Sequence, residues 1–324
     1  MTDNQQNTAG LAAMEAPLSP PRSDSPVDSN SVDSNSLSTA PLSIRQLALL
    51  HPRERLLVPP TNWTPRHLEV LRCSFSEPAP APATALAGKP QGGDYLRHEM
   101  ERWVWRSPSG RSDTVRDLIG GAFTSQRNIG FYFHQRQVQI LTCDLLFCKV
   151  DESFDQTLKD NPDALPPIVA AYVDLHQIDS ARMEHFGVFK ISRYRPMRRR
   201  LLCLNKLKKA KSTNHLHDPY IAALLIAIAQ DDMHFARDLS AISSWTPQVL
   251  VSSDDTENFH LYKASISHSF LRAFDNPTIA PSEPVCMPIQ ISTIPFQPYE
   301  SLSDRIIALL LSEQTLERKR ESED

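Results

Sequence analysis

The chain has 324 residues, of which 40% are hydrophobic and 22% charged, and its formal net charge at pH 7 is -4. This length and composition suffice for a packed core, and the near balance of charge excludes a whole-protein field that draws the chain to nucleic acid or an anionic membrane. Five cysteines form an odd, sparse set, which is typical of thiols kept reduced inside the cell.

Further classes of protein are excluded by missing patterns. The nine glycines stand singly or as the pairs Gly92-Gly93 and Gly120-Gly121, so the sequence has no phosphate-binding glycine loop. The opening residues "MTDNQQNTAG" lack the charged and apolar regions of a secretory signal, and no apolar run reaches the ~20 residues of a membrane helix. We therefore expect a protein of the cytoplasm, the nucleus or both, with no membrane partner and no cofactor.

The composition divides the chain into four parts. Residues 1–41 are rich in Ser, Pro, Asp and Asn and repeat the pentapeptide "VDSNS", which predicts a disordered head. Residues 42–75 form a short helical segment, in which "SIRQLALL" predicts one helix and "NWTPRHLEVLRCSF" a second, with Thr64 as cap and Pro65 at its first position. Residues 76–93 are a Pro/Ala-rich linker, and residues 94–324 are the main domain.

Helix and strand patterns alternate in the first half of the main domain. The stretch "DYLRHEMERWVW" predicts a helix, and "GFYFHQRQVQILTCDLLFCKV" is rich in strand formers. In "LPPIVAAYVDLHQI" the spacing of the apolar residues predicts one face of a helix that begins near Ile168 and includes Leu175 and Ile178. The following "FGVFKISRYR" predicts a strand with Phe189 and Ile191 on one face.

The second half continues the alternation. The stretches "PQVLVSS" and "NFHLYKASI", separated by "DDTE", predict a hairpin, and "SHSFLRAF" predicts a short helix. A strand over "PIQISTIPF" precedes a final helix from residue 301, where Ser301 and Asp304 form a capping box. The whole predicts an α+β fold, a mostly antiparallel sheet with packed helices, after a disordered N-terminal segment.

The stretch "STNHLHDPYIAALLIAIAQDD" admits two interpretations. His215 and His217 are spaced so that both imidazoles could bind one metal ion, with Asp218 as a further ligand. Alternatively, Asp218 caps a helix in which Pro219 takes the first position, and the apolar run over 221–229 predicts that this helix is buried. The helix explains more of the residues, so we favour it over the metal site.

An acidic turn offers a second candidate site. Asp254, Asp255 and Glu257 precede Lys263, an order similar to that of nucleases of the PD-(D/E)XK type, in which carboxylates hold Mg²⁺ beside a lysine. The position two residues before Lys263 is Leu261, which breaks the motif, and acidic residues are common in turns. Together with Asp218, these residues are the weak catalytic candidates of a hydrolase.

A third candidate is the basic stretch at 190–211, which contains ten Lys or Arg. It is compatible with a solvated loop, with a nuclear-import signal around Lys208, and with phosphate contacts to nucleic acid. We favour the solvated loop over the other two interpretations. The basic patch proper consists of Arg198, Arg199, Arg200, Lys206, Lys208, Lys209 and Lys211.

Three segments carry a family resemblance: "WTPRHLEVL", "LHDPYIAALLIAIAQ" and "YKASISHSFLRAFDNP". They resemble segments that recur in this order in uncharacterised proteins of filamentous fungi, and the resemblance spans residues 42–311. Its residues are mostly packing and capping positions, so it implies a shared fold and transfers no catalytic residue. Some such proteins are encoded near natural-product biosynthesis genes, which implies an accessory role in a biosynthetic pathway.

The sequence leaves three functional hypotheses. The first is a non-catalytic accessory or interaction protein whose partner is another protein, because the chain has no complete catalytic, phosphate-binding or metal-binding motif. The second is a metal-dependent hydrolase or divergent nuclease, and the third is a nucleic-acid-binding module that uses the basic patch.

Overall fold

The computed structural model describes residues 41–84, 93–103, 106–120, 122–148, 168–188, 197–236, 243–282 and 286–323. These residues belong to one compact unit, Ala40–Asp324. The disordered head predicted for 1–41 lies, except for its last residue, outside the described residues. So does the core of the strand predicted at 186–195, because Phe189 and Ile191 are outside them as well.

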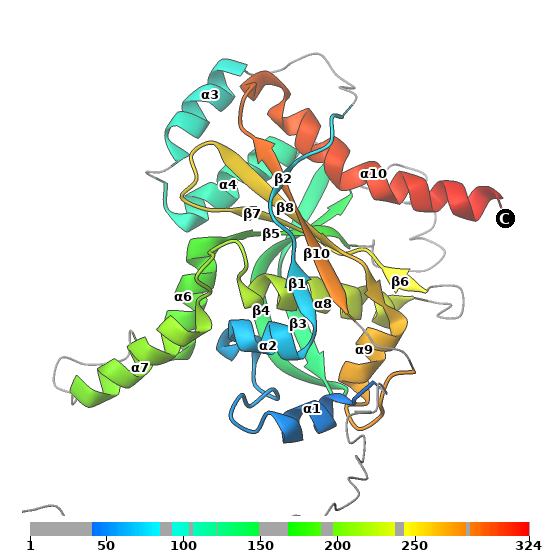
Figure 1. Ribbon diagram of the computed structural model, residues 1–324. Helices are drawn as coiled ribbons and strands as arrows, with labels where there is room; N and C mark the ends of the chain where they lie inside the picture. Colours follow the sequence, from blue (N-terminus) through cyan, green and yellow to red (C-terminus); the bar gives the residue numbers. More distant parts are fainter. Residues whose placement is uncertain are drawn as a thin grey trace, which may run out of the picture. The chain divides into compact units, whose positions relative to one another are not determined.

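A mixed sheet forms the centre of this unit (Figure 1), in the order β1-β10-β8-β7-β5-β4-β3, and β2 also pairs with β10. Neighbours are antiparallel except for β5 with β7 and for β1 and β2 with β10. A small separate sheet pairs β6 (Ser244–Trp245) with β9 (Ile266–Ser267). The strands of the main sheet are β1 (Cys73–Phe75), β2 (Ala79–Pro80), β3 (Phe123–Phe133), β4 (Arg136–Cys148), β5 (Ile168–Asp174), β7 (Gln248–Ser252), β8 (Asn258–Ala264) and β10 (Met287–Pro295).

Helices pack on both faces of the sheet, and this confirms the predicted α+β fold with packed helices. One core includes Leu225 of α8 and Val249 and Tyr262 of the sheet, while the other includes Leu118 of α4, Phe259 of the sheet and Leu310 of α10. None of the described helices is long and apolar enough to cross a membrane. The helices are α1 (Ile44–Leu50), η1 (Pro60–Asn62), α2 (Pro65–Val70), α3 (Gly93–Glu101), α4 (Pro108–Ile119), α6 (Leu175–His185), α7 (Met197–Ala210), α8 (Pro219–Phe235), α9 (His268–Asp275), η3 (Tyr299–Ser301) and α10 (Leu302–Glu323).

The helix predicted after "HLHD" is confirmed as α8. Asp218 is its N-cap, Pro219 occupies the first position, and every residue from Pro219 to Gln230 is buried. Near its C-terminal end the Gln230 side chain bonds to the backbone of Tyr132, accepting from its N–H and donating to its C=O. Gln230 thereby takes the place of a neighbouring strand at this point of the edge strand β3.

Most other predicted elements are also confirmed: α1, α2 with Pro65 at its first position, α3, β4 with the last residues of β3, the β7–β8 hairpin, α9, β10 and α10. The part of β3 before Gly130 was not predicted. The prediction of a helix over 168–178 is wrong in its first part. Residues Ile168–Asp174 form β5, in which all seven residues are buried, and the helix α6 starts only at Leu175. A strand that is covered on both faces has a continuous run of apolar residues. Such a run also contains apolar residues at helical spacing, which is why it was interpreted as a helix.

Two local predictions were wrong for reasons of backbone geometry. The helix over 62–75 ends at Val70, because Arg72 takes a left-handed conformation at φ 56° and the chain then continues into β1. The capping box of the last helix does not form, since Ser301 belongs to η3 and its hydroxyl donates to the carbonyl of Pro298. Residues 76–81 of the predicted linker lie beside β10, with which Ala79 and Pro80 pair.

Candidate functional site

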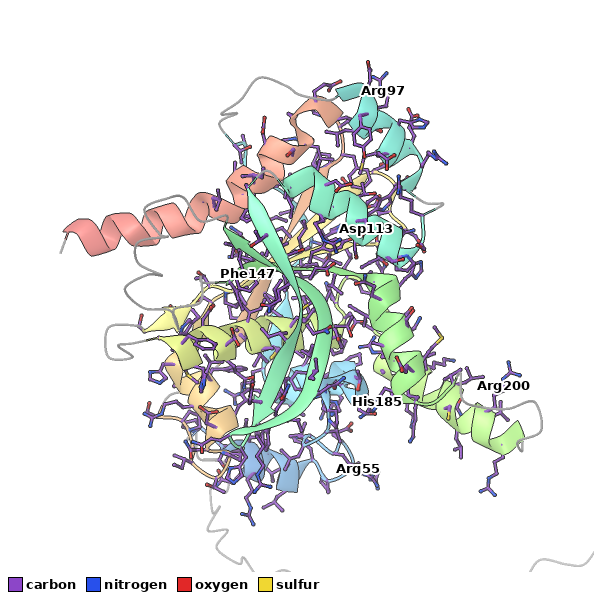
Figure 2. All side chains as sticks on the ribbon, turned by 180° about the vertical axis from the view of Figure 1, so that it is seen from behind. Arg55, Arg97, Asp113, Phe147, His185 and Arg200 are labelled. Atoms are coloured by element: carbon purple, nitrogen blue, oxygen red, sulfur yellow. The ribbon has the colours of Figure 1, made fainter. Side chains whose placement is uncertain are left out.

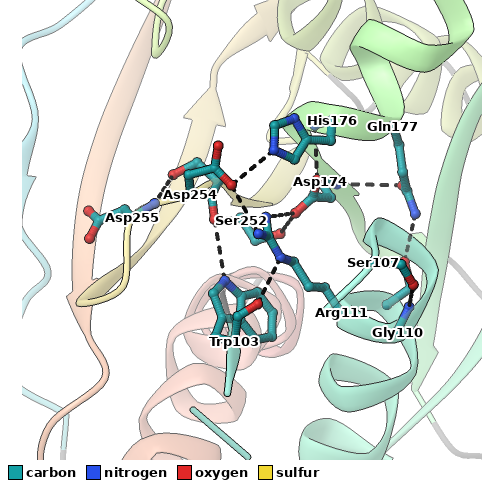
Figure 3. A network of polar contacts seen from close by, with 12 residues as sticks. Trp103, Ser107, Gly110, Arg111, Asp174, His176, Gln177, Ser252, Asp254 and Asp255 are labelled. Atoms are coloured by element: carbon teal, nitrogen blue, oxygen red, sulfur yellow. Dashed lines mark hydrogen bonds and ion pairs between the residues drawn. The ribbon is translucent and has the colours of Figure 1, made fainter. Parts of the chain in front are cut away.

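A network of polar contacts lies where the parallel strands β5 and β7 end (Figure 3). Asp174 is the last residue of β5 and stands opposite Ser252, the last residue of β7. The carboxyl ends of adjacent parallel strands are a frequent place for ligand sites. We call this cluster the polar clamp, and it consists of Arg111, Asp174, His176, Ser252 and Asp254.

Asp174 is the buried centre of the polar clamp. One carboxylate oxygen accepts the backbone N–H of His176 at 2.9 Å, so that Asp174 caps α6. The other accepts the Ser252 hydroxyl at 2.7 Å and an Arg111 N–H at 3.1 Å. Because Ser252 donates to Asp174, the Tyr172 hydroxyl donates to Ser252 at 2.7 Å, and burial raises the pKa of Tyr172, which keeps that proton in place.

Arg111 brings α4 to this centre. Its guanidinium donates to the backbone carbonyls of Trp103 and Ser253 and to both carboxylates of the clamp, including Asp254 at 2.9 Å. The guanidinium also lies 5.6 Å from the centre of the Trp103 ring, within the range of a cation–π contact. The two carboxylates offset the cost of burying the guanidinium charge. The ion pairs also connect α4 with β5 and with the β7–β8 turn.

Asp254 and His176 form the solvent-facing end of the clamp. The carboxylate of Asp254 contacts the His176 Nε2 at 2.9 Å, and the hydrogen bond from Arg111 holds the pKa of Asp254 below its usual range. The clamp's own hydroxyl, that of Ser252, is buried and bonded to Asp174, so it offers His176 no nucleophile to activate.

A polar groove adjoins the clamp between α4, α6 and the β3–β4 hairpin. Its lining includes Ser109 and Ser112 from α4, Gln177 from α6, and Asn128 and Asp144 from the hairpin. Gln177 donates to the Ser112 hydroxyl at 2.7 Å and thus bridges the two helices across the groove. These groups could bind a small polar ligand by hydrogen bonds.

The residues of "HLHD" serve the start of α8. Asp218 accepts the backbone N–H of Tyr220 at 2.8 Å and forms a two-point ion pair with the buried Arg182 at 2.6 and 2.7 Å. His215 is exposed, and the ring of His217 stacks on Phe75 at 5.2 Å. Within the described ranges, no group of three or more His, Cys, Asp or Glu is placed to hold a metal ion.

The structure brings only part of the acidic turn into the clamp. Asp255 accepts the backbone N–H of Glu257 at 2.8 Å and therefore closes the turn between β7 and β8. Lys263 lies further along β8 and donates to the carbonyl of Leu309 in α10, at 3.5 Å. Asp218 contacts Arg182 at the start of α8. α8 packs in the core that includes Leu225, not in the core that includes Phe259.

The described part of the basic patch is a helix, so the prediction of a solvated loop is wrong there. α7 spans Met197–Ala210, and Arg198, Arg200, Lys206, Lys208 and Lys209 are exposed on it. Lys211 follows the helix and pairs with Asp179 of α6 at 2.6 Å. Residues 190–196 and the side chain of Arg199 lie outside the described residues.

Sequence reasoning missed Arg111, Asp174 and His176. Arg111 shares its helix face with Val115 and Leu118, so a cation on an apolar stripe was the available signal. Asp174 and Gln177 have the spacing of a capping box, which the structure confirms and which marks the start of α6. No comparable signal marked His176.

In comparison with known proteins, the chain matches no family model and no curated protein sequence.

Proposed function

We propose that the protein is a non-catalytic interaction protein that docks α7 into a groove of a partner protein. The observation that carries this proposal is the surface of α7. Leu201 is 53% exposed and Leu204 is 39% exposed, although leucine side chains of folded domains are among those most often buried. The helix and Lys211 carry seven Lys or Arg and no acidic residue.

One end of α7 is attached to the rest of the unit. Ala210 is buried, Lys211 pairs with Asp179, and the helix lies beside η1. The other end, with Arg200, projects away from the sheet (Figures 1 and 2). A helix held at one end presents its free surface in a fixed orientation, which lowers the ordering cost of binding.

Both features of α7 suit a protein partner. Helices that dock into grooves use apolar anchors at spacings of three and four residues, and Leu201 and Leu204 have the first of these spacings. The cations would steer the helix to an acidic rim and would favour partners of opposite charge. Contacts to nucleic-acid phosphates would explain the cations but would leave the exposed leucines unexplained.

The contacts of the other candidate residues support the non-catalytic proposal. Asp254 is bonded to Arg111, Asp218 pairs with Arg182, and Lys263 donates to Leu309 in a different part of the unit. These three residues do not lie together in one site, as the hydrolase alternative requires. The resemblance to fungal proteins suggests in addition that the partner is a component of a biosynthetic pathway in the cytoplasm or nucleus.

Photo-cross-linking from α7 tests this proposal. A photoreactive residue replaces Leu201 in the full chain, and the cross-linked partner is identified, purified and titrated with the unmodified protein. We expect Leu201→Ser with Leu204→Ser to weaken binding at least about tenfold, as truncation of interface anchors does. Arg198→Glu with Arg200→Glu should also weaken binding and reduce its dependence on salt.

Leu57 provides the matched control, since it is also 53% exposed but lies between α1 and η1. Leu57→Ser should leave the affinity for the partner unchanged. The free energy of unfolding of every variant should lie within about 0.5 kcal/mol of the parent's. The proposal fails if Leu57→Ser weakens binding as much as the α7 variants do. It also fails if the cross-linked species from α7 is nucleic acid, which would favour the nucleic-acid-binding alternative.

A further inference from the structure

Two adjoining hollows lie along α9, at the end of the unit where Figure 1 shows α1 and α9. The first lies between α9 and α1, and the second between α9 and the turn at 276–282. Ala273 and Pro281 line both hollows, so the two are neighbours and we describe them together as one groove. We call it the α9 groove.

The floor of the α9 groove is apolar and its walls are fixed. Leu47, Val70, Phe270 and Phe274 line the first hollow. The backbone N–H of Arg45 donates to the carbonyl of Pro277 at 2.8 Å, which holds α1 against the turn after α9. Leu42 and Ile279 also line the groove and are 41% and 64% exposed, so apolar surface continues beyond the floor.

Among the described residues, the charges that line the α9 groove have one sign. Arg72 lines the first hollow and Arg272 the second, and none of the described lining residues is Asp or Glu. Within the described part of the chain, neither guanidinium takes part in an ion pair. The acidic residue of α9, Asp275, is half-buried and interacts electrostatically with Arg272 and with His268 and His234. Each hollow therefore offers one cation beside apolar surface.

We propose that the α9 groove binds a short acidic segment of another protein, with apolar side chains in the two hollows and carboxylates on Arg72 and Arg272. Arginine pairs with carboxylates in a two-point geometry, which selects acidic over neutral or basic segments. Apolar anchors next to such pairs exclude water and strengthen them. The α9 groove shares no residue with α7, so this inference stands independently of the docking proposed for α7.

A selection from a random library of displayed 12-residue peptides on the full chain tests the proposal. The enriched peptides should contain aromatic or aliphatic residues and more Asp and Glu than Lys and Arg. Synthetic copies should compete with one another and should lose at least tenfold in affinity for Arg72→Glu and for Arg272→Glu. Ala273→Leu, which fills the junction of the two hollows, should abolish binding.

Arg97→Glu makes the same charge change on α3, which lies at the other end of the unit in Figure 2, and should leave peptide affinity unchanged. Because Ala273→Leu could disturb packing, the two surface arginine variants decide the outcome if its melting temperature falls. Enriched peptides that are basic, or whose affinity ignores Arg72 and Arg272, would overturn the proposal. So would a selection without enrichment. Variants of α7 should not affect peptide binding, which separates a failure of this inference from a failure of the proposed function.

Discussion

The side chain of Asp218 has two structural roles. It caps α8, and it neutralises Arg182, whose side chain is completely buried. A lost cap costs about 0.5–2 kcal/mol, whereas breaking a buried ion pair costs about 3–5 kcal/mol because the remaining charge has no partner. We therefore expect Asp218→Asn, which keeps an oxygen for the cap, to lower the free energy of unfolding by about 3–5 kcal/mol in urea denaturation.

A double-mutant cycle isolates the ion pair. Arg182→Met alone leaves the Asp218 carboxylate without its partner, so Arg182→Met combined with Asp218→Asn should cost less than the sum of the two single changes. If Asp218→Asn alone lowers the free energy of unfolding by less than about 1 kcal/mol, the ion pair contributes almost nothing to stability. The cap, which Asn retains, would then be the only stabilising role of Asp218.

We expect His260 to make the stability of the fold depend on pH. Its ring is buried in β8, and burial lowers the pKa of the imidazole, with a smaller lowering by His215 and an opposing effect of Asp255. The unfolded chain, with a histidine pKa of about 6.5, therefore binds the proton more readily than the folded chain. Stability should be complete above this pKa and should fall as the pH drops below it.

Urea denaturation at about pH 7.5 and about pH 5.5 measures this effect. The parent should be less stable at the lower pH, and His260→Gln, which cannot titrate, should show a smaller difference between the two values. An equal difference in parent and variant would assign the pH dependence to other groups, such as the buried His67, whose pKa is also lowered by burial.

The cap at Asp218 could be predicted from the sequence because a cap and its helix are neighbours in the chain. Arg182, its ion-pair partner, is 36 residues away, and no local pattern joins the two. The same holds for Arg111 and Asp174, which are 63 residues apart. Caps are local, so the cap at Asp218 could be predicted, although the cap at Asp174 was missed together with the end of β5. Buried ion pairs depend on how distant elements pack, so both of these pairs were missed.

At the scale of elements, α8 and β5 show when an apolar run can be interpreted. β5 is buried throughout and α8 from Pro219 to Gln230, and periodicity cannot distinguish a buried helix from a buried strand. Length and punctuation decide: α8 has 17 residues after an Asp-Pro start, whereas β5 has seven and ends at the capping box of α6. Treating Asp174 as a boundary would have separated the strand from the helix.

The basic stretch shows the opposite limitation. Leu, Lys and Arg are good helix formers, so α7 agrees with local propensity, and its cations misleadingly suggested a loop. Charge indicates that a segment is solvated, but it does not indicate that the segment lacks structure. The exposed leucines of α7 could be identified only once the helix was placed beside η1 and α6.

At the scale of the whole molecule, the first described residues complete the sheet that later residues build. β1 and β2 pair in parallel with β10, and the Ile291 backbone donates to the Ser76 hydroxyl, 215 residues away in sequence. Trp63, Leu68 and Leu71 belong to the same core as α8. The division at 76–93 follows composition, which does not record pairing between distant strands, and the structure has one compact unit from Ala40 onward.

Two truncated chains test this organisation. A chain of residues 41–324 keeps every core residue among those the structure describes. It should unfold at the same temperature as the full protein, since the composition of the removed head offers no core-forming face. A chain of residues 94–324 loses Trp63, Leu68, Leu71 and Cys73 from the core. Each large apolar side chain removed from a core costs about 2–5 kcal/mol, and whole domains are stable by only about 5–15 kcal/mol.

The shorter chain should therefore show no cooperative thermal transition and should lose the near-ultraviolet circular dichroism of packed aromatic side chains. Adding residues 41–93 as a separate peptide should restore part of that signal, because the missing strands and the buried Trp63 would return to the core. A cooperative transition of the 94–324 chain at the temperature of the full protein would contradict this expectation. It would mean that residues 42–75 contribute little to the stability of the main domain and behave as a separate segment joined to it by a linker.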